Sequence, residues 1–213
     1  MIYKFLPLIL FCAFSFKPLN TADLEKNVIS NTDPKLIASN AKVALETKCK
    51  TFYTTIDANN LSLPKFDSFF AAFQGYEQLK AQGKITNEIL TVIDFSLSSI
   101  EERMWVIDMK TQKVILKSLV AHGRNSGVEF ATNFSNENES YKSSLGFYLT
   151  GEVYQGKHGL SLRLDGMEYG INDKARDRAV VIHGADYVSK KLARAQGYIG
   201  RSQGCPAVPY EVQ

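Results

Sequence analysis

The sequence has almost no excess of charge of either sign. Its 25 lysines and arginines stand against 22 aspartates and glutamates, which gives a formal net charge of +3. Removal of residues 1–22 would take away Lys4 and Lys17 but no acidic residue, so the chain would come still closer to neutrality. Proteins that bind nucleic acid need a basic footprint for the phosphate backbone. We therefore expect no nucleic-acid partner.

The N-terminus lacks an apolar run long enough to cross a bilayer comfortably. The run at residues 5–14 is short, follows Lys4 and contains no acidic residue. This combination is typical of a secretory signal rather than of a membrane-spanning helix. We expect residues 1–22 to be a signal peptide or an N-terminal anchor, and the protein to be exported. Membrane contact is expected only through this segment, if it is not cleaved.

Cysteine is scarce: the chain has 3, of which Cys49 and Cys205 would remain after export. Two cysteines can pair in an oxidising compartment, so a domain held by one disulfide is one interpretation. Cys49 stands between two lysines in a helical pattern, whereas Cys205 stands between glycine and proline in a turn context that no disulfide requires. We favour a free thiol at Cys205.

Histidine is equally scarce, at 3 residues. His122, His158 and His183 are far apart in the sequence, and none stands at metal-ligand spacing from another histidine or from Cys205. We therefore expect no metal site. His158 follows Gly156 and Lys157 and is expected to be solvated.

Two helices are predicted before residue 89. Asp33 followed by Pro34 is typical of a helix start, and apolar residues at helical spacing follow it. We assign residues 23–63 to a linker and this N-terminal helix. A second helix is predicted over Pro64–Gln82, ending at Gly83. Its aromatic stripe is assigned to the core; the stripe consists of Phe66, Phe69, Phe70, Phe73 and Tyr76.

From residue 89 onward the pattern is that of a β-rich domain. Strands are predicted over residues 89–96, 103–108, 114–121, 145–150, 159–164 and 178–182, with a hairpin turn at residues 108–113. The chain is long enough for one substantial core. The sequence therefore predicts an α+β fold, in which helices precede a predominantly β domain at residues 64–213.

The most informative residues lie near the C-terminus, where His183 and Cys205 each stand beside glycine. Residues 180–184 end a predicted strand on His183-Gly184, and residues 200–206 carry Gly204 and Cys205. A thiol nucleophile needs a base within hydrogen-bond reach. Glycine beside the sulfur lets backbone N–H groups approach a developing oxyanion. The pattern indicates acyl transfer.

Three other interpretations do not fit these residues. Residues 200–204 satisfy the G-x-S-x-G pattern of α/β-hydrolases, but no histidine follows Ser202, as that fold requires. A papain-like site has its cysteine before its histidine. A sortase-like site has the order found here, but it also has an arginine after the cysteine. No arginine follows Cys205 in this chain.

Five motifs, taken in order, resemble the catalytic domain of the murein L,D-transpeptidases. They are Asp94-Phe95-Ser96, His122 to Gly127, Ser143 to Tyr148, Ile182-His183-Gly184 and Gly200 to Pro206. The resemblance covers roughly residues 64–209. It implies an L,D-transpeptidase-like β-sandwich or barrel. It also implies an enzyme of the periplasm or cell envelope that acts on peptidoglycan stem peptides and needs no cofactor.

The resemblance implies roles for individual residues. Cys205 would attack as a thiolate, with His183 as the base and a carbonyl near Gly184 accepting from the second ring nitrogen. The N–H groups of Gly204 and Cys205 would stabilise the oxyanion. Arg201 would bind a substrate carboxylate, unless it forms a structural salt bridge. The other residues expected to line the substrate site are Ser202, His122, Tyr148 and Tyr169.

Two features depart from the family pattern. Gln203 stands where the better-known branch has a histidine, so this position supplies no second imidazole. The family's domains usually continue through another strand, whereas this chain stops at Gln213. Both a catalytic domain that ends at Gln213 and one that is truncated there stay open.

The expected reaction begins with attack of Cys205 on the amide between a diaminoacid's L-centre and the terminal D-alanine. D-alanine leaves and a thioester remains. An acceptor amine would then give a 3→3 crosslink, whereas water would give L,D-carboxypeptidase activity. A non-catalytic wall-binding protein that retains the fold is the alternative from another class.

Overall fold

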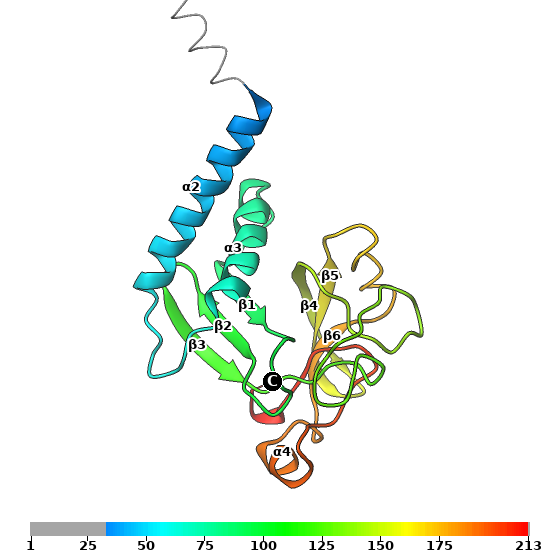
Figure 1. Cartoon of the computed structure of the whole chain (residues 1–213). Helices are drawn as coiled ribbons and strands as arrows, with labels where there is room; N and C mark the ends of the chain where they lie inside the picture. The colour runs from blue at the N-terminus through cyan, green and yellow to red at the C-terminus, as the bar shows by residue number, and fades with distance from the viewer. Residues whose placement is uncertain (1–32, 213) are drawn as a thin grey trace, which may run out of the picture. The chain divides into compact units, whose positions relative to one another are not determined.

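The computed structural model describes residues 33–212 (Figure 1). The chain divides into two compact units, one ending at Ala44 and the other beginning at Leu45. The predicted signal peptide or anchor, and the linker predicted after it up to residue 32, lie outside the described residues. Helix α2, Pro34–Thr55, begins as predicted, because the Asp33 carboxylate accepts a hydrogen bond of 2.9 Å from the N–H of Lys35.

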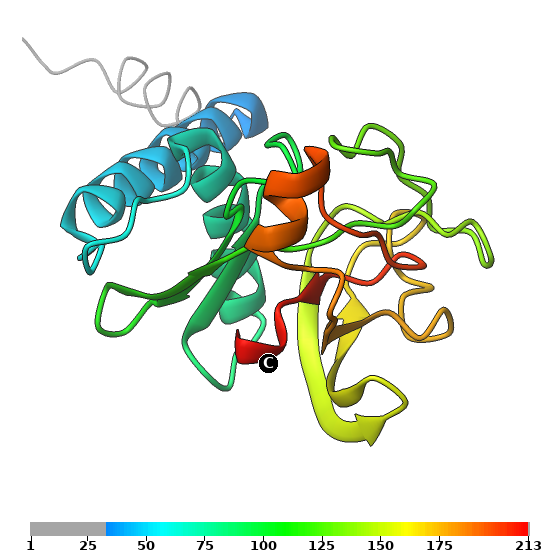
Figure 2. The same cartoon turned by 90° about the horizontal axis from the view of Figure 1, so that it is seen from below.

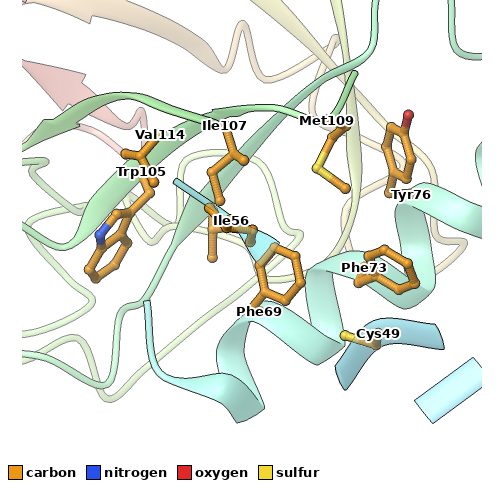
Figure 3. Packing of buried hydrophobic residues seen from close by; sticks show 10 residues of the cluster. Cys49, Ile56, Phe69, Phe73, Tyr76, Trp105, Ile107, Met109 and Val114 are labelled. Atoms are coloured by element: carbon orange, nitrogen blue, oxygen red, sulfur yellow. The ribbon is translucent and has the colours of Figure 1, made fainter. Parts of the chain in front are cut away.

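Helix α3, Phe66–Ala81, buries Phe69, Phe73 and Tyr76 of the predicted aromatic stripe, and Phe66 and Phe70 are half-buried against them. Phe69 and Phe73 are 0% and 1% exposed, and their ring centroids lie 5.8 Å apart. Burial of each such ring stabilises the fold by roughly 1.5–3 kcal/mol. The rings form the centre of an apolar cluster (Figure 3), whose other buried members are Cys49, Ile56, Tyr76, Val92, Trp105, Ile107, Met109 and Val114.

The first sheet is antiparallel, in the order β1-β2-β3. Its strands are β1 (Ile89–Ile93), β2 (Met104–Asp108) and β3 (Lys113–Ser118). The carboxylate of Asp108 accepts hydrogen bonds from the N–H groups of Lys110 and Thr111, at 2.9 and 3.0 Å. This closes the predicted hairpin turn between β2 and β3. The sheet directs Trp105, Ile107 and Val114 into the cluster around α3.

The second sheet has the order β4-β5-β6-β7. Its strands are β4 (Tyr148–Gly156), β5 (Gly159–Gly166), β6 (Val181–Gly184) and β7 (Ala207–Val208). β4, β5 and β6 pair antiparallel, and β7 pairs parallel with β6. β7, in red in Figure 2, was not predicted from the sequence. β4 begins three residues later than predicted and runs on to Gly156.

A second apolar cluster lies where β6 and β7 meet the helix α4, Lys190–Gln196. Ser189 caps this helix by accepting a hydrogen bond from the N–H of Leu192. The N–H of Ala121 donates to the carbonyl of Ala207 at 2.8 Å, so the segment after β3 lies against β7. The cluster is made of Leu119, Ala121, Ala185, Val188, Ala193, Ile199 and Ala207. It supports both chain segments that carry the candidate site.

The described residues thus form a mixed α/β structure with three helices and two sheets, and with a short 3-10 turn at Tyr210–Val212. This agrees with the predicted α+β class. The β-sandwich or barrel arrangement implied by the resemblance stays a prediction. Within residues 33–212, no helix combines the length and the apolar character that a bilayer crossing requires.

Candidate active site

His183 lies on β6, between Ser161 of β5 and Ala207 of β7. The residue is buried, and its Nδ1 lies 2.9 Å from the carbonyl oxygen of Gly184. This is the contact expected from the sequence. A carbonyl can only accept, so Nδ1 carries the proton and Nε2 keeps a free lone pair. The local geometry therefore presents the neutral imidazole as a base.

The surroundings of His183 favour its neutral form. Burial lowers the pKa of the imidazole below its ordinary value. The hydrogen bond to Gly184 opposes this effect, while the charges of His158 and Lys157 add to it. A base with a lowered pKa keeps its lone pair available into mildly acidic solution.

Cys205 lies two residues before Ala207, the β7 residue that pairs with His183. Pro206 and Val208 line a pocket together with Ile182. The parallel pairing of β6 and β7 thus brings the segment that carries Cys205 beside the strand that carries His183.

Cys205 is a half-buried free thiol, and the other described cysteine, Cys49, is a buried free thiol in the core around α3. The Sγ atom of Cys205 lies 3.7 Å from the carbonyl oxygen of Ala179. Burial raises the pKa of this thiol, against the effects of the Val181 N–H and of the charges on Arg178 and Lys157. The thiol is therefore protonated at neutral pH and needs a base before it can attack.

The turn before Cys205 is shaped by Ser202. Its buried hydroxyl accepts a hydrogen bond of 3.0 Å from the N–H of Gly204 and donates one of 2.6 Å to the carbonyl of Cys205. Gly204 has a φ of 124°, and a Cβ there would lie 2.8 Å from the carbonyl oxygen of Lys142. Only glycine fits this position without strain.

These contacts correct the expectation for the backbone donors. The N–H of Gly204 is bound to Ser202 inside its own turn, so it is not aimed at an oxyanion. The N–H of Cys205 makes no hydrogen bond within residues 33–212. Cys205 is therefore the backbone donor of the pair that can meet a developing negative charge. Ser202 shapes the turn with the hydroxyl that was expected to line the substrate site.

Ser143 connects three of the sequence motifs. Its buried hydroxyl accepts from the N–H of Gly123 and donates to the carbonyl of Gly204, at 3.0 Å in both cases. Its own N–H donates to the hydroxyl of Ser126 at 2.9 Å. The segments around residues 123, 143 and 204 are separated in sequence but form one buried polar network. The sequence motif that contains Ser143 does not by itself reveal this role.

Arg178 is a second residue that sequence reasoning missed. Its guanidinium donates to the carbonyls of Ser135 and Lys142, at 2.8 and 2.6 Å, and to the hydroxyl of Ser144. It thereby fixes the loop at residues 135–144 close to Gly204, and its charge acts on Cys205. The only signal in the sequence is an arginine shortly before the His-Gly motif, which by itself has no specificity.

His122 does not line a groove, contrary to the expectation from sequence. The residue is 0% exposed, and its Nδ1 lies 2.7 Å from Nη2 of Arg103. Arginine can only donate, so Nδ1 accepts and Nε2 donates to the carbonyl of Gly127 at 3.2 Å. Burial and the charge of Arg103 lower the pKa of His122 to about 4. His122 is a neutral structural residue under the site.

The three remaining residues expected at the substrate site each lie in a separate environment. Arg201 is half-buried, donates to the carbonyl of Gly127 at 3.3 Å and lies over the ring of Tyr198. Tyr148 is half-buried, and its hydroxyl donates to the carbonyl of Ser144 at 3.0 Å. Tyr169 is 95% exposed on a loop. A contact of these three side chains with substrate stays a prediction.

A pocket of about 970 Å³ is lined by residues of the two sheets and of α3. Its lining is largely apolar and includes neither His183 nor Cys205. No group of three or more histidine, cysteine, aspartate or glutamate side chains that could hold a metal ion occurs within residues 33–212.

Comparison with known proteins identifies the family. A family model described as the L,D-transpeptidase catalytic domain matches residues 59–213. No curated protein and no solved structure matches the chain in the corresponding searches. The match covers most of the chain and confirms the resemblance drawn from the five motifs. The family consists of peptidoglycan-modifying transpeptidases that act on stem peptides. The chain belongs to the L,D-transpeptidase catalytic domain family.

Proposed function

We propose that this protein is an exported cysteine L,D-transpeptidase that forms 3→3 crosslinks between peptidoglycan stem peptides through a thioester on Cys205. One observation carries the proposal: the parallel pairing of β6 with β7 brings His183 and the segment of Cys205 side by side. The hydrogen bond from Nδ1 to Gly184 supports it, because it leaves Nε2 free to accept the thiol proton.

The first half-reaction uses the two side chains in sequence. His183 takes the proton of the Cys205 thiol, and the sulfur attacks the carbonyl carbon between the diaminoacid's L-centre and D-alanine. The N–H of Cys205 donates to the resulting oxyanion. When the C–N bond breaks, His183 returns its proton to the leaving amine. D-Alanine departs, and an acyl thioester remains on Cys205.

The second half-reaction reverses these steps with a new amine. The acceptor amine of a neighbouring stem attacks the thioester carbonyl while His183 takes one of its protons. The C–S bond then breaks, and the sulfur recovers the proton from His183. The product is an amide between two stems, and the free thiol is regenerated. Water in place of the amine would give a tripeptide.

Positive charge near the sulfur suits the carboxylates of a stem peptide. Lys157 and Arg178 both act electrostatically on Cys205. Arg178 is held by backbone carbonyls, whereas Lys157 forms no ion pair within residues 33–212. We assign Lys157 to the terminal carboxylate of the donor, since an exposed ammonium can approach it without breaking other contacts.

The proposal is tested by incubating the purified protein with a disaccharide-tetrapeptide and identifying the products by mass spectrometry. The expected product is a crosslinked dimer formed with loss of D-alanine. His183→Ala should abolish it, and Lys110→Met, an exposed substitution in the turn between β2 and β3, should not. Tripeptide alone would replace the transpeptidase by a carboxypeptidase. Unchanged substrate with binding retained would replace it by a wall-binding protein.

A further inference from the structure

His158 lies directly against the proposed base. The ring centroids of His158 and His183 are 4.5 Å apart, and the ring planes differ by 24°, which is a stacked arrangement. His158 is exposed and His183 is buried, so the outer ring covers the inner one. No other ring pair within residues 33–212 includes His183.

The position of His158 is fixed by a tight turn. Gly156 of β4 pairs with Gly159 of β5, so Lys157 and His158 are the two residues that join these strands. Gly159 has a φ of 81°, a conformation that glycine adopts at little cost in such hairpins. β5 in turn pairs with β6 through Ser161 and His183. The hairpin therefore carries the imidazole of His158 to a defined place beside the base.

We propose that His158 is a positioning residue of the transpeptidase reaction, which holds the ring plane of His183 by stacking. The inference rests on the proposed function, in which His183 acts as the base. Stacking restricts rotation of the His183 ring about the bond to its Cβ, while the Gly184 carbonyl fixes one edge. Together they point Nε2 in one direction.

The electrostatic part follows from the groups that face His183. Lys157 and His158 come from the β4–β5 turn, and the residues that pair with His183 on β5 and β7 are the uncharged Ser161 and Ala207. Positive charge on His158 or Lys157 lowers the pKa of His183. These charges therefore favour the neutral form of His183, which keeps its lone pair.

Two substitutions separate the two parts of the role. His158→Phe keeps an aromatic ring for stacking but removes the charge. It should leave kcat at the pH optimum nearly unchanged and move the acid limb of the pH–rate profile to higher pH. His158→Ala removes both contributions. It should also lower kcat at the optimum by about three- to tenfold, the range expected for loss of an aromatic pair. Lys110→Met is the matched surface control.

The decisive measurement is a titration of the three histidine rings by NMR of protein labelled with ¹³C-histidine. His183→Gln identifies the signal of the base. Because the charge of His158 lowers the pKa of His183, the His183 signal should titrate at higher pH in His158→Phe than in the wild type. An unchanged kcat in His158→Ala, together with an unchanged His183 titration in His158→Phe, overturns the inference. Because the titration needs no substrate, it gives a result even if no transpeptidase activity is found.

Discussion

The region around α3 and the region around Cys205 are stabilised by different interactions. Around α3, aromatic and aliphatic side chains pack into one cluster, and few polar groups take part. Around Cys205, the hydroxyls of Ser143 and Ser202 and the guanidinium of Arg178 bind backbone N–H and carbonyl groups of three segments, at Gly123, at residues 135–144 and at residues 204–205. In the first region, burial of apolar side chains stabilises the fold. In the second region, hydrogen bonds fix the positions of the loops.

This difference affects how each region tolerates change. A packed apolar core accepts other apolar side chains of similar volume at a modest cost. A buried polar network does not, because each hydrogen bond needs a donor and an acceptor at a fixed distance and angle. We therefore expect substitutions around α3 to change the free energy of unfolding, and substitutions around Cys205 to change activity as well.

The largest expected contrast is between the two cysteines. Cys205→Ala should lower transpeptidase activity by at least about a thousandfold, because no other group can form the thioester. Cys49→Ala should retain activity and lower the free energy of unfolding by about 1 kcal/mol. Burial raises the pKa of Cys49 to about 11, so iodoacetamide at neutral pH should label Cys205 and spare Cys49. Mapping of the labelled peptides checks this; preferential labelling of Cys49 would contradict the assignment.

The aromatic core should respond in the opposite way. Phe73→Ala removes a ring that is 1% exposed and that lies against Phe52 and Phe69. The free energy of unfolding should fall by about 3–5 kcal/mol, while activity per folded molecule stays within about twofold. Urea unfolding and active-site titration measure the two quantities. A loss of activity in the fully folded fraction would show that the two regions are coupled.

Two glycines with positive φ, one in each region, allow the region around α3 and the region around Cys205 to be compared directly. Gly204→Ala would place a Cβ 2.8 Å from the Lys142 carbonyl oxygen, whereas Gly83→Ala, just after α3, meets no atom within 4 Å. Gly83→Ala should cost about 1 kcal/mol of stability, from backbone conformation alone. Gly204→Ala should cost about 1–3 kcal/mol and also lower kcat about a hundredfold, because the turn must move. Equal kcat values in the two variants would argue against a tightly fitted turn.

The smallest expected effect is a pH dependence of stability that comes from His122. Its pKa in the folded protein is about 4, below the ordinary value of about 6.5 in the unfolded chain. Between these two pH values the unfolded chain binds more protons, so the stability from this residue is complete above the unfolded pKa and declines as the pH falls toward 4. The decline should be of the order of 2 kcal/mol. Urea unfolding at pH 7 and pH 4.5 should show a smaller difference in His122→Gln than in the wild type.

Sequence patterns predicted elements that have a long local signal. α2 with its Asp33 cap, the aromatic stripe of α3 and the hairpin from β2 to β3 follow from residue spacing. α4 and β7 are short and have no clear periodicity, and they were missed. The start of β4 was placed too early, because residues 145–147 have strand-like composition but lie against the loop at residues 168–172.

The residues of the candidate site also differ in how far a local sequence pattern marks them. His183, Gly184 and Cys205 could be singled out because their residue types and order are specific to one chemistry. His122 was expected at a groove because its motif is specific, but only burial beside Arg103 reveals its structural role. Ser143, Arg178 and His158 act through neighbours that are distant in sequence, so no local pattern marks them.

The sequence by itself determined the family and the α+β class, and it singled out Cys205 and His183 as candidates, because periodicity and motif order are properties of the chain. Only the tertiary structure decided which hydroxyl holds the turn at Gly204, which N–H of that turn has no partner among the described residues and which ring covers His183. Each of these depends on parallel or antiparallel pairing between strands that are separated along the chain. Pairing of this kind is set by the burial and hydrogen bonding of the whole fold, not by any one segment.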